Sequence, residues 1–327
     1  MACSQSLALK MKNENLNSQM KKVGVGLLAG VLVPGAAWAC ACGCGVFDVG
    51  TGLMLPEGAG GMAFLDYDYQ DQNQNWSGHS SATAVNNGDK EIETHFVTLG
   101  LQYMFNRSWG AQIEVPYWTR TFNTDVNFGA PPAQVVSRNW SGLGDLRIKG
   151  IYTGFSEDLS SGITFGLKLP TGSDNRNGDV VDRDTQISSG STDVLLGGFY
   201  RHQLTHDNSF TWFAQAELDV PVLKQGDYRP GLEADAAAGI YYNNLSLGRV
   251  KITPVAQVIG SWRGRDNGAA AAPDDSGYQR VLLSPGIEFH LHPVKIYADV
   301  EIPVYQNMNG NQLVAPALVK VSLSYMF

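Results

Sequence analysis

The stretch that decides the fold is Val97–Phe105, VTLGLQYMF, in which every odd-numbered residue is large and apolar. The even positions between them carry mostly small or polar side chains, among them Thr98, Gly100 and Gln102. Because successive side chains of a β-strand point to opposite faces, this period of two gives one apolar and one mostly polar face. The stretch therefore predicts a strand between an apolar and a polar environment.

The same alternation recurs along the chain and predicts about twelve strands, an even number as single-chain outer-membrane barrels prefer. The expected strands are Gly61–Tyr69, Thr94–Phe105, Trp109–Phe122, Gly144–Phe155, Gly162–Pro170, Thr192–His202, Ser209–Val222, Leu232–Tyr242, Val250–Trp262, Gln279–Leu291, Val294–Tyr305 and Ala317–Phe327. The ninth strand, Val250–Trp262, fits the alternation only if Val255 and Ile259 face inward. The alternation also admits ten or fourteen strands.

Connection lengths separate a soluble sandwich from a transmembrane barrel. Tight turns, as at Asn106–Ser108 and His292–Pro293, alternate with long polar segments, as at 71–90, 123–141, 171–189 and 263–276. Short periplasmic turns and long extracellular loops are typical of bacterial outer-membrane barrels. The sequence therefore predicts an all-β, antiparallel, up-and-down transmembrane barrel over residues 58–327.

Aromatic residues support the same fold. They gather beside the short turns, as at Tyr103, Phe105 and Trp109, where a membrane barrel carries an interfacial girdle. The chain ends on Phe327 with Tyr325 two residues before it, a pattern that resembles the C-terminal signal read by the outer-membrane assembly machinery. Both residues are expected to act in assembly, and lipid is the expected surrounding of the barrel.

Residues 1–39 read as a secretory signal. The apolar run from Val23 to Ala39 follows two lysines and closes on Ala-Trp-Ala, and Met20 offers a later start. Without this leader the net charge changes from -8 to roughly 19 - 30 = -11, which excludes a nucleic-acid binder. The expected location is the outer membrane of a Gram-negative bacterium.

Four strands end in a shared phrase. It reads IEVP at 113–116, LKLP at 167–170, LDVP at 218–221 and VEIP at 300–303, and in each the charged residue and the proline share the lumen face. Because proline cannot donate to a β-ladder, the preferred interpretation is structural: these prolines mark where strand pairing weakens. Contact with a ligand is the alternative.

The phrases Ser141–Leu146 (SGLGDL), Leu169–Ser173 (LPTGS) and Ser189–Asp193 (SGSTD) resemble the outer-membrane family named for the meta-cleavage pathway of phenol degradation. The resemblance covers most of the mature chain and is densest over residues 139–200. It implies a barrel that acts as a channel or transporter. It implies nothing about the solute.

Residues 40–57 form a Cys- and Gly-rich segment that is expected to be periplasmic. Cys40, Cys42 and Cys44 lie within five residues, a spacing that fits neither haem attachment nor paired zinc knuckles. The segment is compatible with a processing remnant, a disulfide to a partner protein, a soft-metal site for Cu(I) or Zn, or a lipid anchor at Cys40. No other cofactor is expected.

Projecting the alternation inward gives the lumen wall. The predicted lumen residues are Glu114, Arg147, Lys149, Lys168, Glu217, Asp219, Glu233, Asp235, Asp299 and Glu301. Bases and acids are expected on different arcs of this wall, which would set a field across the pore and select solutes by charge. The alternative is that the groups pair and plug a narrow barrel.

The predicted function is therefore a channel for small solutes, and an enzyme is not expected. A hydrolase needs a serine within hydrogen-bond reach of a histidine, and His95, the one histidine on a strand near the upper rim, has no such phrase beside it. The alternative is a docking barrel for a periplasmic redox or metal-handling partner, which would bind at the cysteine segment.

Overall fold

The computed structural model describes residues 60–84, 87–127, 131–174, 181–224 and 226–327. The chain divides into two units, Met1–Ala36 and Ala37–Phe327, and every described residue belongs to the second. The predicted signal peptide through residue 39, the possible start at Met20 and the cysteines of segment 40–57 all lie outside the described residues. Within the described part of the chain, no helix is long and apolar enough to cross a bilayer.

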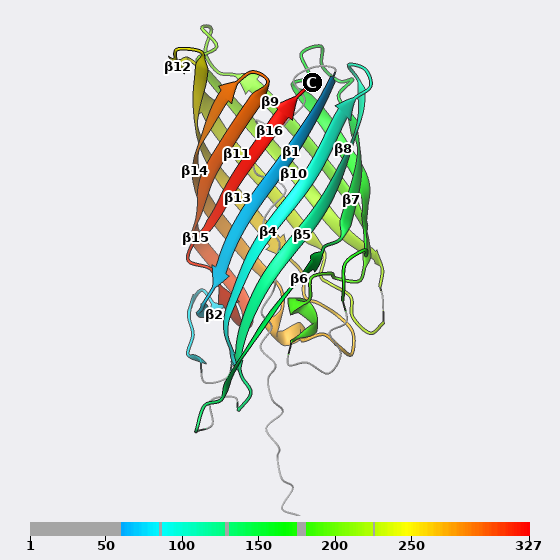
Figure 1. Ribbon diagram of the computed structural model, residues 1–327, viewed down its shortest axis with the longest axis vertical. Helices are drawn as coiled ribbons and strands as arrows, with labels where there is room; N and C mark the ends of the chain where they lie inside the picture. The colour runs from blue at the N-terminus through cyan, green and yellow to red at the C-terminus, as the bar shows by residue number, and fades with distance from the viewer. Residues whose placement is uncertain (1–59, 85–86, 128–130, 175–180, 225) are drawn as a thin grey trace, which may run out of the picture. The chain divides into compact units, whose positions relative to one another are not determined.

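Twelve wall positions form one closed antiparallel barrel (Figure 1). They are occupied in ring order by β1 (Gly60–Gln72), β4 (Asp89–Met104), β5 (Trp109–Asp125), β7 (Leu146–Tyr152), β8 (Ser161–Leu169), β9 (Thr192–Gln203), β10 (Phe210–Leu223), β11 (Glu233–Tyr242), β13 (Val250–Arg263), β14 (Tyr278–Leu291), β15 (Val294–Val314) and β16 (Leu318–Met326). β16 pairs with β1 from Met62 opposite Met326 to Gln70 opposite Leu318. This pairing leaves no open edge, and the predicted fold class is confirmed.

Short strands extend the sheet at its rims. They are β2 (Gln74–Gly78), β3 (Ser80–Ser81), β6 (Val135–Leu143) and β12 (Leu245–Leu247). Single-turn 3-10 helices lie at Arg183–Thr185 and Pro273–Asp275. β1 begins and β16 ends at the end of the barrel that carries the short turns, while most of the long connections gather at the other end (Figure 1). In outer-membrane barrels the short turns face the periplasm.

The exposure of side chains follows the predicted alternation. Leu99 and Phe105 point outward with 58% and 65% of their surface exposed, whereas Gln102 and Met104 point inward and are buried. In β13, Val255 and Ile259 are buried, so the condition placed on the ninth strand is met. The outer surface is thus an apolar band, and the inner surface carries most of the charge.

Two predicted strands differ most from the structure in extent. The strand expected at Val294–Tyr305 continues to Val314 as β15. We expected a single strand from Gly144 to Phe155, but this wall position is divided between β6 and β7. β5 pairs with β7 as far as Glu114 and with β6 from Tyr117 onward. Pro116 lies at the break, where its carbonyl accepts a hydrogen bond from Gly144 N at 2.8 Å.

The other prolines of the repeated phrase also lie where pairing is interrupted. Pro170 follows the last residue of β8. The β9–β10 ladder shifts register just after Pro221, and the β14–β15 ladder shifts beside Pro303. These positions support the structural interpretation of the phrase, since proline contributes no donor to the ladder.

Phe327 helps to close the barrel and is expected to be needed for assembly. Its backbone exchanges two hydrogen bonds with Gly61 at 2.8 Å each, and its ring, 61% exposed, stacks near Tyr325. We expect Phe327→Asp to deplete the protein from the outer membrane, measured by heat-modifiable migration. Phe155→Asp, at a similarly exposed aromatic beside another short turn, is the control for a charge in the interface. Normal levels of the Phe327 variant would contradict the assembly role.

Candidate functional site in the lumen

The ten predicted lumen residues all occupy inward positions. Glu114 lies on β5, Arg147 and Lys149 on β7, Lys168 on β8, Glu217 and Asp219 on β10, Glu233 and Asp235 on β11, and Asp299 and Glu301 on β15. Glu114, Lys149, Asp299 and Glu301 are buried, with at most 5% of their surface exposed. Since their outward neighbours, such as Ile113 and Ile148, are exposed, these charges face the interior of the barrel.

Two lysines, Lys149, which is buried, and Lys168, which is mostly buried, join β5, β7 and β8 to β10. Lys149 Nζ lies 2.9 Å from Glu217 Oε2 and 3.6 Å from Glu114 Oε1. Lys168 Nζ contacts Asp193 and lies 2.7 Å from Asp219 Oδ2. The bases of β7 and β8 and the acids of β10 lie on different strands, but they form ion pairs with one another, as in the alternative stated for the lumen. The wall is tightly curved and lysine is long, so bases of β7 and β8 reach acids of β10.

A second charged cluster lies on β15, β16 and β1. Lys320 Nζ is 3.6 Å from Asp68 Oδ1. In the sheet, Lys320 of β16 lies directly opposite Asp68 of β1 on one side and Asp299 of β15 on the other. Asp299 Oδ2 accepts hydrogen bonds from Tyr297, Ser284 and Gln257. Asp66, Asp68 and Lys320 were not predicted, although their even-numbered positions within alternating strands mark them as inward. Across the described residues, no group of His, Cys, Asp or Glu is arranged to hold a metal ion.

Four carboxylates form a square on two neighbouring strands. Glu217 lies directly opposite Asp235, and Asp219 directly opposite Glu233. Lys149 and Lys168 balance the two acids of β10. Of the β11 pair, Glu233 accepts a hydrogen bond from Tyr278 Oη at 2.8 Å, and Asp235 Oδ1 is buried without a hydrogen bond. Arg263 of β13 lies directly opposite Glu233 in the ladder.

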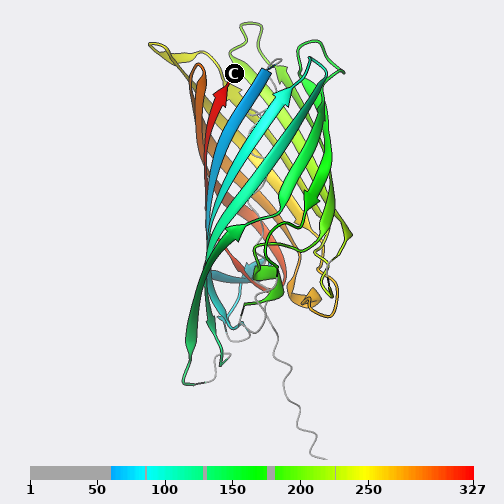
Figure 2. The same cartoon turned by 45° about the vertical axis from the view of Figure 1, so that its right-hand side comes forward.

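The segment 181–191, which we call the strap, lies at the long-loop end of the barrel (Figure 2). The sequence predicted an extracellular loop over 171–189. Val181 and Ile187 of this segment are instead buried in a cluster with Ile92, Phe122, Trp140 and Leu313. Because Ile92 and Leu313 come from β4 and β15, the strap packs against separate parts of the wall at this end of the barrel.

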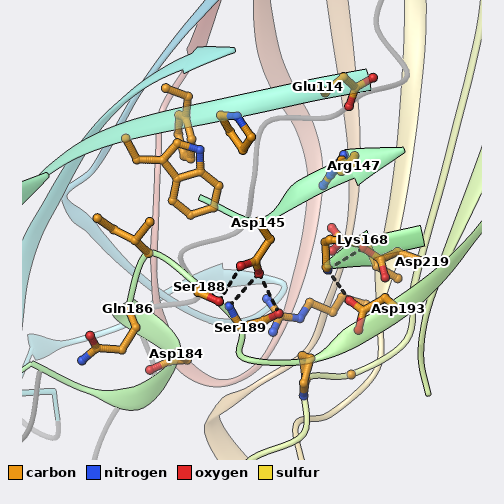
Figure 3. A pocket seen from close by; sticks show the side chains of 18 of the residues that line it. Glu114, Asp145, Arg147, Lys168, Asp184, Gln186, Ser188, Ser189, Asp193 and Asp219 are labelled. Atoms are coloured by element: carbon orange, nitrogen blue, oxygen red, sulfur yellow. Dashed lines mark hydrogen bonds and ion pairs between the residues drawn. The ribbon is translucent and has the colours of Figure 1, made fainter. Parts of the chain in front are cut away.

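Arg120 and Asp145 anchor the strap, and neither was predicted as a site residue. Arg120, fully buried on β5, donates from Nη1 to the carbonyls of Thr185 at 2.6 Å and Gln186 at 3.3 Å. Asp145, at the break between β6 and β7, accepts hydrogen bonds from Ser188 Oγ at 2.5 Å and Ser189 N at 3.1 Å (Figure 3). The broken strand thus turns a carboxylate inward to hold the strap.

The strap is also tied to two other loops. Arg183 donates to the carbonyls of Ser188 and Ser189 and lies 4.5 Å over the ring of Tyr228. Tyr228 Oη in turn donates to Asp266 Oδ2 at 2.7 Å, and Asp266 lies in the segment 264–277. Three connections at this end of the barrel therefore form one network of contacts.

The strap carries a carboxyl group whose charge opposes closure. Burial, together with the nearby Asp89 and Asp184, raises the pKa of Asp182 from 3.8 to about 9. A released strap would return Asp182 to an ordinary pKa. The state with the strap in place therefore loses stability as the pH rises from about 4 to about 9. In this range the carboxyl group of Asp182 ionises readily only when the strap is released. We expect conductance to rise over this range, and Asp182→Asn to flatten the rise.

Single-channel recordings between pH 5 and pH 9 test this expectation. Asp274→Asn is the control, since Asp274 is an almost fully exposed carboxylate at the same end. An unchanged pH profile in the Asp182 variant would show that this group does not control the strap.

A cavity lies between the strap and the charged wall (Figure 3). Strap residues Asp184, Gln186, Ser188 and Ser189 line one part of it. Arg147, Lys168 and the four carboxylates of the square line another, while Phe96, Pro116 and Trp118 add an apolar part from β4 and β5. A solute in this cavity would meet fixed charges of both signs and an aromatic surface.

A closed antiparallel barrel with an apolar outer band, aromatic residues beside its short turns and a charged interior defines an outer-membrane β-barrel. The model of the family described as "Putative MetA-pathway of phenol degradation" matches residues 68–306. The chain belongs to this family. No curated protein matches the sequence.

Solved structures share the fold at low sequence identity. An outer membrane channel from Pseudomonas putida F1 matches with a TM-score of 0.61 and 13% identity, over 86% of this chain and 100% of that one. The beta domain of the Bordetella autotransporter BrkA matches with a TM-score of 0.50 and 13% identity, over 82% of this chain and 100% of that one. At such identities these matches support the fold.

Proposed function

We propose that the protein is an outer-membrane channel for small solutes and that its charged lumen wall sets the selectivity. The observation that carries the proposal is the cavity beneath the strap, lined by charged residues from β5, β7, β8, β10 and β11. The likeness to an outer membrane channel of Pseudomonas putida F1 agrees with this role. A channel of this kind moves solutes by diffusion along the wall.

The charge balance of the cavity favours cations and neutral polar solutes over anions. Its lining holds nine carboxylates and four basic side chains, a difference of 9 - 4 = 5 negative charges. Walls of one sign in a region of low dielectric raise the local concentration of the opposite ion, and salt weakens the effect. Lys149, which pairs with Glu217 but lies outside this lining, reduces the excess to 9 - 5 = 4 negative charges.

Planar-bilayer recordings under a KCl gradient test the proposal. The purified full-length protein should pass current, with a reversal potential that indicates preference for K⁺ and that shrinks at high salt. No current at any pH would contradict the channel. Current with a reversal potential of zero, or of the opposite sign, would contradict selection by the acidic wall alone.

A docking barrel is the alternative role, and it would act through Cys40, Cys42 and Cys44. These residues lie outside the described part of the chain, so this role stays a prediction, as does recognition by the assembly machinery. An enzyme finds no support at His95, which faces outward. Its contacts are with Tyr67, Tyr69 and Glu93, and no serine is among them.

A further inference from the structure

We propose that the short-turn end of the lumen contains a binding site for oxyanions that carry two or more negative charges. The site is separate from the cavity beneath the strap. It goes beyond the proposed channel, because an anion can bind there whether or not the barrel conducts. The proposal depends on a row of basic residues, an arginine across the lumen and a buried hydroxyl group.

A second cavity, of about 890 Å³, lies at the short-turn end of the barrel. Its lining comes from the ends of β9, β10, β11, β13, β14 and β15 and from the turns at positions 158–160, 208 and 243–244. Binding sites for small molecules usually have volumes of about 300 to 1,000 Å³. The cavity is therefore large enough for an inorganic oxyanion or a small organic polycarboxylate.

Three neighbouring strands carry basic residues in one row of this lining. Lys251 of β13 lies directly opposite His290 of β14, and His290 lies directly opposite Lys295 of β15. Lys295 is buried, with 5% of its surface exposed. Like charges on neighbouring strands repel each other, and the repulsion is larger in a desolvated wall than in water. An anion bound against the row would offset this repulsion.

Two acids in the lining offset part of the positive charge. Glu288 lies diagonally to Lys251 and Lys295, and Asp158 accepts a hydrogen bond from the backbone of its own turn. Both lysines and Arg201 of β9 stand against these acids, a difference of 3 - 2 = 1 positive charge, and the two histidines of the lining can only add to it. The short-turn end therefore has the opposite charge to the cavity beneath the strap.

Arg201 approaches the row from the other side of the lumen. In ring order, β10, β11, β13 and β14 lie between β9 and β15. Five steps around a ring of twelve place Arg201 and Lys295 on nearly opposite sides of the barrel. A ligand between them would meet basic groups from two directions, and an anion with several charges can satisfy both.

A buried hydroxyl group points to acceptor oxygens on the ligand. Thr253 of β13 lines the same cavity, two residues after Lys251, and has 1% of its surface exposed. Among the described residues, its Oγ1 has no hydrogen-bond partner. A buried hydroxyl without a hydrogen bond is unfavourable. An oxyanion would accept a hydrogen bond from Thr253 with one oxygen while the basic groups contact the others.

Three anions test the class of ligand. Trimesate carries three carboxylates, inorganic phosphate is a small polyvalent oxyanion, and acetate has a single charge. Calorimetric titration of the full-length protein in non-ionic detergent measures each Kd without requiring conduction. We expect trimesate or phosphate to bind at least about fivefold more tightly than acetate, because the attraction grows with the charge of the ligand, and added KCl to weaken binding. Tight binding of only one of the two supports the site and assigns it to polycarboxylates or to phosphates.

Four variants assign the affinity to this cavity. Lys251→Gln should weaken binding about fivefold, and Thr253→Val, which removes the hydroxyl with little change in shape, about threefold. Asp158→Asn removes one acid and should strengthen binding about twofold, a gain that loss of folding cannot produce. Lys224→Gln is the control, since Lys224 is an exposed lysine outside the cavity, and it should not change the Kd.

Absence of binding to the wild-type protein, or equal affinity for all three anions, would overturn the inference. So would affinities that Lys251→Gln, Thr253→Val and Asp158→Asn leave unchanged. In planar bilayers, the anion that binds most tightly should reduce the current when added to one side only, because the acidic cavity and the strap separate the site from the other side. Equal block from both sides would contradict a site at one end. Absence of current with intact binding would contradict the channel and leave this site in place.

Discussion

Releasing the strap should raise the conductance of the barrel several-fold. Asp145→Ala removes the acceptor for Ser188 and Ser189, and hydrogen bonds to a charged group contribute about 1.5 to 3 kcal/mol each. The loss of two such bonds would move a large fraction of molecules to the released state. Single-channel recordings of wild type and variant in the same buffer measure the change.

A second anchor tests the same idea independently. Arg120→Met replaces the charged guanidinium by an unbranched apolar side chain. The carbonyls of Thr185 and Gln186 then lose their donor. This variant should also raise conductance. Asp274→Ala, at an exposed carboxylate of the same end, should not. If both anchor variants fold normally and conduct like wild type, the strap is not the main barrier to passage.

Removal of Lys168 should strongly destabilise the barrel. Lys168→Met leaves Asp193, which is fully buried, and Asp219 without their shared counter-charge. Breaking a buried ion pair from one side lowers the free energy of unfolding by about 3 to 5 kcal/mol. Urea titration of the protein in lipid vesicles should therefore show a lower midpoint than for wild type.

The pair of Arg265 and Asp274 provides the matched control. Their atoms are 3.2 Å apart, but the side chains are 57% and 94% exposed. Arg265→Met should change stability by less than about 1 kcal/mol, as is usual for surface pairs. Replacing Asp193 and Asp219 by leucine together with Lys168→Met should restore stability. Equal midpoints for Lys168→Met and Arg265→Met would refute a buried ionic network.

The alternation of side chains was sufficient to predict the barrel, because each strand faces lipid on one side along its membrane-spanning part. It could not locate the break between β6 and β7. Inward positions are even-numbered in β6, up to Gly142, and odd-numbered in β7, from Arg147. Leu143 and Leu146 flank the change, so apolar residues continue through it. A shift of one residue at Gly144 and Asp145 is therefore difficult to see in the pattern.

The candidate site was predictable to the extent that it depends on strand parity. All ten proposed lumen residues face inward because parity alone decides this. Their pairing was not predictable, since Lys149 and Glu217 are 68 positions apart and meet through the curvature of the wall. Arg120 and the strap were missed for a similar reason. The sequence of the strap shows no alternation of apolar and polar residues. Arg120, which binds the carbonyl of Thr185, lies 65 positions earlier in the chain.

The contacts from Arg183 to Tyr228 and from Tyr228 to Asp266 have a consequence for how the long loops can diverge among relatives of this protein. Surface loops normally accept insertions and substitutions one at a time. Here, replacing Tyr228 removes a partner from both other connections, and replacing Arg183 or Asp266 removes a partner of Tyr228. Changes at these three positions should therefore be accepted in combination. A relative with a different long-loop end of the barrel should differ in all three loops together.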